Sequence, residues 1–392
     1  MIKKLPSFFV SCGEVSGDLY AADLIAELRE QSSEIWGMMG PRGIQAGGEA
    51  TWSYEELKLM GFIEVIPAIP RLFKLRNNIV REIMARSPDA VIVVDSPDFH
   101  FALVKKLRSV GYKGLTVFLV TPTVWAWRSS RTKLLKNYFD LSLPLFSFEH
   151  DFLVKCGVNS HWVSHPLAKT LENYSPPAEL KTRYEGARVI AIMPGSRNYA
   201  IKFHLPQLIE AAKLLRNEGF LPVFSVARGL SEPLRLELTE RLAGLEKWDG
   251  DGRGLMGASE AVAGVSGTVA VEAMLLRRFM VVIYNGKGLS WLLARLLVRI
   301  PYISIPNYLT DEPVFPELLK DDAKPERIVH ELCAYLGDPV RKAKIDQLMD
   351  SARNAMGTTE TAPFWVRSIM DNIMYKNKDA LSFRNFQSEG DK

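Results

Sequence analysis

The sequence is poor in cysteine and histidine: its 392 residues include three cysteines and six histidines. Cys12, Cys156 and Cys333 are too few and too far apart for a disulfide framework or a zinc site, which favours a reducing compartment, by default the cytoplasm. The histidines lack companions at metal-ligand spacing, so the sequence predicts no metal centre.

Long apolar runs and a strong net charge are also missing. Glu14 and Asp18 interrupt the N-terminal apolar run after about six residues, so we expect no signal peptide, and no run approaches the roughly 18 residues that span a bilayer. The formal net charge of +4 is too small to predict nucleic-acid binding. Any membrane contact is therefore expected to be peripheral.

What the chain does have is a regular alternation of β-branched or aromatic runs with helical patterns, as in AVIVV before residues 99–108. This alternation is typical of βαβ units, and the length fits two domains. We therefore predict an α/β protein with two Rossmann-like, doubly wound parallel sheets. A proline-containing break at 173–181 predicts these boundaries: a domain at 1–172, a domain at 173–360, a helix at about 361–376 and a polar, disordered tail at 377–392.

The stretch VIVVDSPDFH, residues 91–100, ends a predicted buried strand in two aspartates. Ser96 and Pro97 fit a helix cap followed by proline at the first helical position. Asp98 then falls in the first turn, where the helix dipole favours a carboxylate. Because ligands of such sheets bind beyond the carboxyl ends of the strands, Asp98 is a candidate site residue. The alternative is that Asp95 and Asp98 only cap the helix.

Two glycine-containing loops in the second half predict a nucleotide diphosphate site. PGSR follows the strand RVIAIM, and SGTVAVE follows the strand AVAGV about 70 residues later. Loop N–H groups and a guanidinium bind phosphate oxygens, and a carboxylate one turn into the helix accepts hydrogen bonds from ribose hydroxyls. The alternative is a surface turn with a solvated arginine. The candidates are Gly195, Ser196, Arg197, Ser266, Gly267, Thr268 and Glu272.

Further candidates follow other predicted strands. GEVSGD lacks the GxGxxG fingerprint, so no dinucleotide cofactor is predicted, and Glu14 is either a ligand contact or part of a tight turn. In TPTVWAWRSSR we expect Trp125 to pack between domains and leave Arg128 open as a phosphate contact. His165 ends the first half near the expected ligand site, although a structural, hydrogen-bonded histidine is the simpler interpretation.

The stretch at 66–86 interleaves apolar residues with cations. That composition suits a monotopic contact with an anionic membrane surface, and the alternative is a surface helix that covers the core. The apolar residues are Ile66, Ile69, Leu72, Phe73 and Leu75, and the cations include Arg71, Lys74 and Arg76.

Taken in order, GEVSGD, LMGFIEV, DSPDF, TPTVWAWR, FSFE, VSHPL, MPGSR, SGTVAVE and IPNYL resemble the motifs of the lipid-A-disaccharide synthase family, inverting glycosyltransferases of family 19. The resemblance covers most of the chain. It implies a GT-B fold, two Rossmann-like domains facing a cleft, with the C-terminal helix packed back on the first domain.

The resemblance also implies a reaction. UDP-2,3-diacylglucosamine donates its sugar to 2,3-diacylglucosamine 1-phosphate, which gives a β-1,6-linked disaccharide 1-phosphate and UDP without a metal or cofactor. Because both substrates carry acyl chains, it further implies a cytoplasmic protein that contacts the anionic inner membrane peripherally.

Particular residues match the family's motifs. Asp98 matches the aspartate proposed to deprotonate the 6-hydroxyl of the acceptor, and Asp95 then orients the loop. Arg197 would stabilise the leaving diphosphate, and Glu272 would hold the ribose. The other matched residues are Asn307 near the nucleotide, and Glu14, Ser16 and Gly17 in the first glycine-rich loop.

The chain departs from the family's usual pattern at His100, where asparagine is usual, at Ser164, where glycine is usual, and at Ala200, where an acid is usual. Two alternatives therefore remain. One is another UDP-sugar GT-B enzyme, such as a UDP-N-acetylglucosamine 2-epimerase or a transferase with a different lipid acceptor. The other is a catalytically idle homologue that binds nucleotide or lipid.

Overall fold

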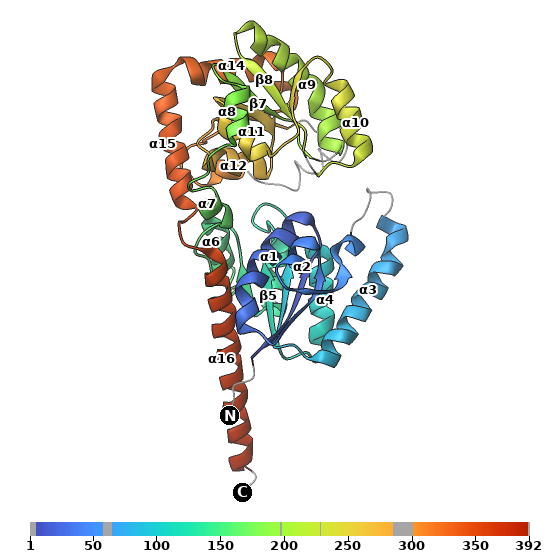
Figure 1. Ribbon diagram of the computed structural model, residues 1–392. Coiled ribbons are helices and arrows are strands. Elements are labelled where there is room, and N and C mark those ends of the chain that lie inside the picture. The colour runs from blue at the N-terminus through green and yellow to red at the C-terminus, as the bar shows by residue number, and fades with distance from the viewer. Residues whose placement is uncertain (1–4, 58–64, 197, 228, 285–300, 391–392) are drawn as a thin grey trace. The chain divides into compact units, whose positions relative to one another are not determined.

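The computed structural model describes residues 5–57, 65–196, 198–227, 229–284 and 301–390 (Figure 1). The chain divides into two compact units. The first unit combines Met1–Pro166 with Thr359–Lys392, and the second unit is Leu167–Thr358. The sequence places the first boundary slightly later, at residue 172.

The first unit is built on a six-stranded parallel sheet in the order β3-β2-β1-β4-β5-β6. Buried parallel strands are near-continuous apolar runs, and AVIVV and LTVFL fit that rule with all ten residues buried. The strands are β1 (Ser7–Cys12), β2 (Glu34–Met39), β3 (Glu49–Ser53), β4 (Ala90–Val94), β5 (Leu115–Leu119) and β6 (Leu141–Leu143).

Helices cover both faces of this sheet. One hydrophobic core joins the sheet to α1 and α16, and the other joins it to α3 and α4 (Figure 1). The helices are α1 (Val15–Leu28), α2 (Pro41–Gln45), α3 (Val65–Arg86), α4 (Pro97–Ser109), α5 (Thr132–Tyr138), α6 (Ser147–Lys155) and α16 (Thr361–Gly390), with the 3-10 turns η1 (Arg29–Gln31), η2 (Tyr54–Leu57) and η4 (Ser129–Arg131).

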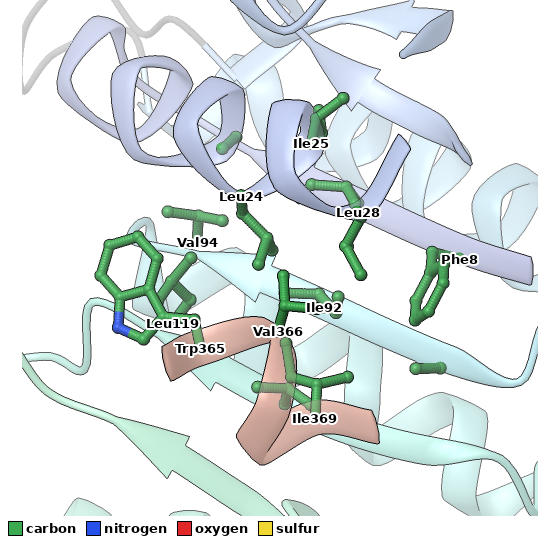
Figure 2. Packing of buried hydrophobic residues seen from close by; sticks show 14 of the residues in the cluster. Phe8, Leu24, Ile25, Leu28, Ile92, Val94, Leu119, Trp365, Val366 and Ile369 are labelled. Carbon is green, nitrogen blue, oxygen red and sulfur yellow. The ribbon is translucent and has the colours of Figure 1, made fainter. Parts of the chain in front are cut away.

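Helix α16 brings the C-terminal part of the chain into the core of the first unit. Trp365, Val366 and Ile369 are buried and pack against α1 and the strands β4 and β5 (Figure 2). The helix continues to Gly390, across most of the stretch predicted as a disordered tail. The polar sequence NKDALSFRNFQSEG contains no proline and includes several good helix formers, so nothing in it ends the helix early.

The second unit repeats the design, with strand order β12-β11-β10-β7-β8-β9. Its strands are β7 (Val189–Met193), β8 (Leu221–Ser225), β9 (Glu246–Trp248), β10 (Ala261–Val265), β11 (Met280–Tyr284) and β12 (Glu317–Leu319). Its helices are α7 (Pro166–Thr170, at the boundary), α8 (Ala178–Arg183), α9 (Asn198–Asn217), α10 (Glu232–Arg241), α11 (Gly252–Ala258), α12 (Thr268–Leu275), α14 (Pro325–Gly337) and α15 (Pro339–Ala355), with the 3-10 turns η5 (Ile305–Tyr308) and η6 (Lys320–Asp322).

The strand orders confirm the prediction of two doubly wound parallel sheets and indicate where each sheet would bind a ligand. In each sheet the order of strand addition reverses once, between β1 and β4 in the first unit and between β7 and β10 in the second. Ligands of open α/β sheets bind at this switch point, beyond the carboxyl ends of the two strands. GEVSGD and DSPD follow β1 and β4, and PGSR and SGTVAVE follow β7 and β10.

Among the residues that the structure describes, no helix combines the length and the apolar character that a bilayer span requires.

Candidate active site

The turn between β4 and α4 carries both aspartates and has an unusual backbone. Asp95 and Ser96 have φ values of 55° and 42°, so two successive residues other than glycine lie in the left-handed region. Each such residue costs roughly 1–3 kcal/mol and persists only where its surroundings enforce it. Helix α4 begins at Pro97, as predicted, but the left-handed Ser96 does not cap it with its side chain.

His100 is one of the groups that enforce this turn. Its ring is fully buried, and burial lowers the pKa of His100 to about 4, so the ring is neutral. Nδ1 lies 2.7 Å from the carbonyl oxygen of Asp95, and Nε2 lies 2.9 Å from the hydroxyl of Ser11 on β1. Because a carbonyl only accepts, Nδ1 donates to Asp95 and Nε2 accepts from Ser11. His100 therefore points into the first unit and holds the turn in place through its hydrogen bond to the Asp95 carbonyl.

The Asp95 side chain joins this turn to the first glycine-rich loop. Its Oδ1 accepts from the N–H of Gly13 at 3.1 Å. Burial raises the pKa of Asp95 to about 7. The hydrogen bonds from Ser96 and Gly13 lower this pKa, and the nearby charge of Glu14 raises it further. A Cβ atom at position 17 would lie 1.9 Å from Oδ2 of Asp95, so Gly17 leaves room for this carboxyl group.

Asp98, in contrast, is open to solvent, with 78 % of its side chain exposed. Its Oδ1 accepts from Arg131 and, at 3.3 Å, from Nη1 of Arg128. Glu14 and Ser16 are also exposed, at the start of α1. Arg131 was not among the predicted site residues, although its place three residues after Arg128 in RSSR, before a short helix, was a usable signal.

An aromatic cluster lies in the segments that follow β5 and β6. Trp125 packs on Phe148 at 5.0 Å between ring centroids and donates from Nε1 to Glu149 at 2.9 Å. Burial raises the pKa of Glu149 to about 7. His165 is buried against Phe146, and burial lowers its pKa to about 3. These contacts of Trp125 lie within the first unit, and its predicted packing between domains stays a prediction.

Ser164 ties together two distant segments of the first unit. Its buried hydroxyl lies 2.5 Å from the carbonyl oxygen of Thr359 and 2.8 Å from Oγ1 of Thr361. The chain leaves the first unit after Pro166 and returns to it at Thr359, so this hydroxyl joins the two connecting segments. A glycine at position 164 would lack both contacts.

In the second unit, the two predicted phosphate loops lie side by side. Gly195 has a φ of 98°, and a Cβ atom there would come within 3.4 Å of Ala200 and 3.9 Å of Val265, the last residue of β10. Gly267 has a φ of 147° and precedes α12, whose first N–H groups begin at Thr268. Ser196, Gly267 and Thr268 are exposed. Arg197 lies outside the described residues.

Glu272 lies one turn into α12 and forms an ion pair with Arg253, whose Nε is 2.8 Å from Oε1. Burial raises the pKa of Glu272, and Arg253 opposes that shift. Arg253 belongs to α11, which Asp251 caps, and Asp251 accepts from the hydroxyl of Tyr174 at 3.0 Å. Arg253 was not among the predicted site residues, because WDGDGRG has no motif that separates it from other loop arginines.

Ser266 and Asn307 are engaged in contacts within the chain. Ser266 donates to the carbonyl of Ile303 at 3.0 Å. Asn307 is buried; its Nδ2 donates to Phe315 at 2.9 Å and to Glu317 at 2.8 Å, while its Oδ1 accepts from Phe315 at 2.8 Å. Ser266 therefore joins the loop that follows β10 to the segment before η5, and Asn307 joins η5 to the start of β12.

Within the described part of the chain, no three histidine, cysteine, aspartate or glutamate side chains are grouped so that they could hold a metal ion.

Comparison with known proteins gives a consistent result. Residues 8–362 match the family described as lipid-A-disaccharide synthetase. The lipid-A-disaccharide synthase of Acinetobacter baylyi is 35% identical over 353 residues, which cover 86% of this chain and 89% of the relative. The enzyme of the same name from Myxococcus xanthus is 32% identical, covering 93% of this chain and 97% of the relative.

Solved structures resemble the fold at low sequence identity. The UDP-GlcNAc 2-epimerase of Neisseria meningitidis, solved bound to UDP-GlcNAc, gives a TM-score of 0.61 at 12% identity, covering 93% of this chain and all of that one (100%). The calicheamicin glycosyltransferase CalG4 gives a TM-score of 0.61 at 13% identity, covering 94% of this chain and 99% of that one. These likenesses confirm the predicted GT-B fold class.

Proposed function

We propose a specific reaction for this chain, which belongs to the lipid-A-disaccharide synthetase family and is therefore a glycosyltransferase of lipid A biosynthesis. It transfers the sugar of UDP-2,3-diacylglucosamine to the 6-hydroxyl of 2,3-diacylglucosamine 1-phosphate. The products are the β-1,6-linked disaccharide 1-phosphate and UDP. The observation that carries the proposal is the family match together with Asp98, a solvent-exposed carboxylate at the switch point of the first sheet.

In the proposed mechanism Asp98 is the general base. The acceptor oxygen attacks the anomeric carbon of the donor, the bond from that carbon to the UDP oxygen breaks, and the hydroxyl proton passes to Asp98. Because attack comes from the face opposite the leaving group, the configuration inverts. A positioned base of this kind contributes about 10²–10⁴-fold to the rate.

The second unit supplies the proposed donor site. The N–H groups around Gly195, Ser196 and Gly267, together with the N-terminus of α12, suit the two phosphates of UDP. Arg197 would add a guanidinium for the leaving diphosphate, so fixed protein charge takes the place of a metal ion. Glu272 would accept hydrogen bonds from the ribose, with Arg253 holding its carboxylate in place.

Helix α3 supports the proposed membrane contact. Leu75, Ile79 and Ile83 face the core, whereas Ile69 and Phe73 are 41% and 51% exposed. The guanidinium of Arg76 lies 4.6 Å from the Phe73 ring centre. An exposed apolar strip flanked by cations suits the surface of an anionic membrane, where the acylated substrates reside. We therefore propose a cytoplasmic protein that binds the inner membrane peripherally.

The test is transfer of radiolabelled sugar from UDP-2,3-diacylglucosamine to the phosphorylated acceptor. Asp98→Asn should abolish turnover and leave UDP binding unchanged; a variant that keeps most of its turnover would remove Asp98 from the mechanism. An epimerase would instead release N-acetylmannosamine from UDP-N-acetylglucosamine without an acceptor. An idle homologue would be stabilised by UDP and form no disaccharide.

A further inference from the structure

The carboxylate proposed as the base is surrounded by more positive charge than it can neutralise. Both Arg128 and Arg131 donate to the same oxygen, Oδ1 of Asp98. Two guanidinium groups and one carboxylate leave an excess of one positive charge in an exposed position. These donors occupy one of the two oxygens of the proposed base.

The two arginines are held in place independently of Asp98. The guanidinium of Arg128 lies 4.2 Å from the ring centre of Trp127, and that of Arg131 lies 5.7 Å from the ring centre of Phe101. Only 15% of the Arg131 side chain is exposed. The backbone of Arg128 is left-handed, with φ of 54°, which starts the 3-10 turn that leads to Arg131. Aromatic faces and a constrained turn therefore present both guanidinium groups to the same side.

A phosphate monoester is the ligand that fits this pair. Guanidinium groups bind phosphate oxygens in pairs, and a phosphate carries more negative charge and more acceptor oxygens than a carboxylate does. A phosphate that arrives next to Asp98 would therefore compete with it for both arginines.

We propose that Arg128 and Arg131 bind the phosphate of the acceptor sugar and that this binding withdraws them from Asp98, which frees its Oδ1 to take the proton of the hydroxyl. The inference rests on the proposed function, which places a phosphate and the reacting hydroxyl on one sugar. On that sugar C1, which carries the phosphate, and C5, which carries the 6-hydroxyl through C6, are both bonded to the ring oxygen. A sugar bound with its hydroxyl at Asp98 therefore holds its phosphate within the reach of neighbouring arginine side chains. In this arrangement only a phosphorylated acceptor releases the base.

The decisive experiment compares Arg131→Ala with the parent protein on two acceptors, 2,3-diacylglucosamine 1-phosphate and 2,3-diacylglucosamine. With the phosphorylated acceptor, kcat/KM should fall roughly 10- to 100-fold, the usual effect of losing a hydrogen bond to a charged group. With the unphosphorylated acceptor it should be at least as high as in the parent, because Asp98 has lost a competing partner. A purely structural role would lower both values equally, and that result would overturn the proposal.

Two further variants complete the test. Arg131→Lys keeps the charge without the planar fork, so it should fall between the parent and Arg131→Ala on the phosphorylated acceptor. Lys133→Ala removes an exposed cation of the same segment and should change neither acceptor's kcat/KM. UDP binding and circular dichroism check that each variant is folded. If Arg131→Ala is not, the two acceptors are compared with Arg131→Lys, which should lower kcat/KM for the phosphorylated acceptor only; an equal fall for both acceptors would overturn the proposal.

A binding measurement separates this inference from the proposed reaction. Micelles that carry either acceptor are titrated into the parent and into Arg131→Ala. Preferential binding of the phosphorylated acceptor that disappears in the variant supports the arginine site, even if the parent shows no turnover. Equal binding of both acceptors by the parent would overturn the site, whatever the turnover.

Discussion

The buried carboxyl group of Asp95 makes the stability of the protein depend on pH in a way that can be calculated. Burial raises its pKa from an ordinary value of 3.8 to about 7. The folded state therefore favours the protonated form of Asp95. The contribution of this group to the stability of the folded state is complete below pH 3.8 and is lost as the pH rises through 7. At about 1.4 kcal/mol per pKa unit, the total is at most roughly 4 kcal/mol.

Asp95→Asn replaces the titrating group by a neutral one of the same shape. The unfolding free energy of the parent should fall between pH 5 and pH 8, because its folded state has to ionise Asp95 over that interval. The unfolding free energy of the variant should fall by about 2–3 kcal/mol less, because it lacks this group. Titrating or charged neighbours that face Asp95 are Glu14 before α1 and Cys12 on β1, and His100 on α4 stays neutral in this range. None of them is changed by the substitution.

The assay is urea unfolding followed by circular dichroism for both proteins at pH 5, 6, 7 and 8. The quantity to compare is the difference between variant and parent at each pH, so any constant cost of the substitution cancels. Glu149→Gln is a companion variant, because burial also raises the pKa of Glu149 to about 7 and the difference should have the same sign. A difference that stays constant from pH 5 to pH 8 would refute the reasoning for Asp95.

Three further outcomes are expected. Gly17→Ala should lower the thermal midpoint by several degrees, because its Cβ atom would lie 1.9 Å from Oδ2 of Asp95, whereas Gly337→Ala, where nothing lies within 4 Å, should have little effect. Ser164→Gly should cost about 1–3 kcal/mol in urea unfolding through its two lost hydrogen bonds; an unchanged midpoint would mean that they contribute nothing. Binding to anionic vesicles should be salt-sensitive and should weaken on charge removal from α3; binding that does not change would point to core packing. The charges to remove are Arg71, Lys74 and Arg76.

The parts of the site that follow from sequence are those set by local pattern. Apolar runs gave the strands, and the loops that follow β1, β4, β7 and β10 carry the predicted motifs at the two switch points. The start of α4 at Pro97 also follows from the sequence, because the fixed φ and missing N–H of proline suit the first helical position whatever the rest of the fold. Each of these inferences uses residues that are close together in the chain.

Contacts that depend on which strands become neighbours did not follow from sequence. Ser11 reaches His100 only because β1 pairs with β4, in a register that sets Ser11 opposite Val93. The inward orientation of His100 depends on this partner 89 residues away, and the contact of Asn307 with Glu317 depends on how the chain folds back from η5 to β12. A histidine or asparagine next to a motif looks the same in the sequence whether it faces a ligand or the core.

The buried hydrogen bonds of His100 and Asp95 stabilise the left-handed turn between β4 and α4. Two successive left-handed residues cost roughly 2–6 kcal/mol together, a large fraction of the stability of a typical domain. The hydrogen bond from Gly13 to Asp95 and those made by His100 offset this cost, since breaking either would leave buried polar groups without their partners. The turn sends Asp95 inward and leaves Asp98 in the first turn of α4, exposed to solvent. The residues that fix the position of Asp98 are therefore mostly buried ones on β1 and α4, which never need to contact a substrate.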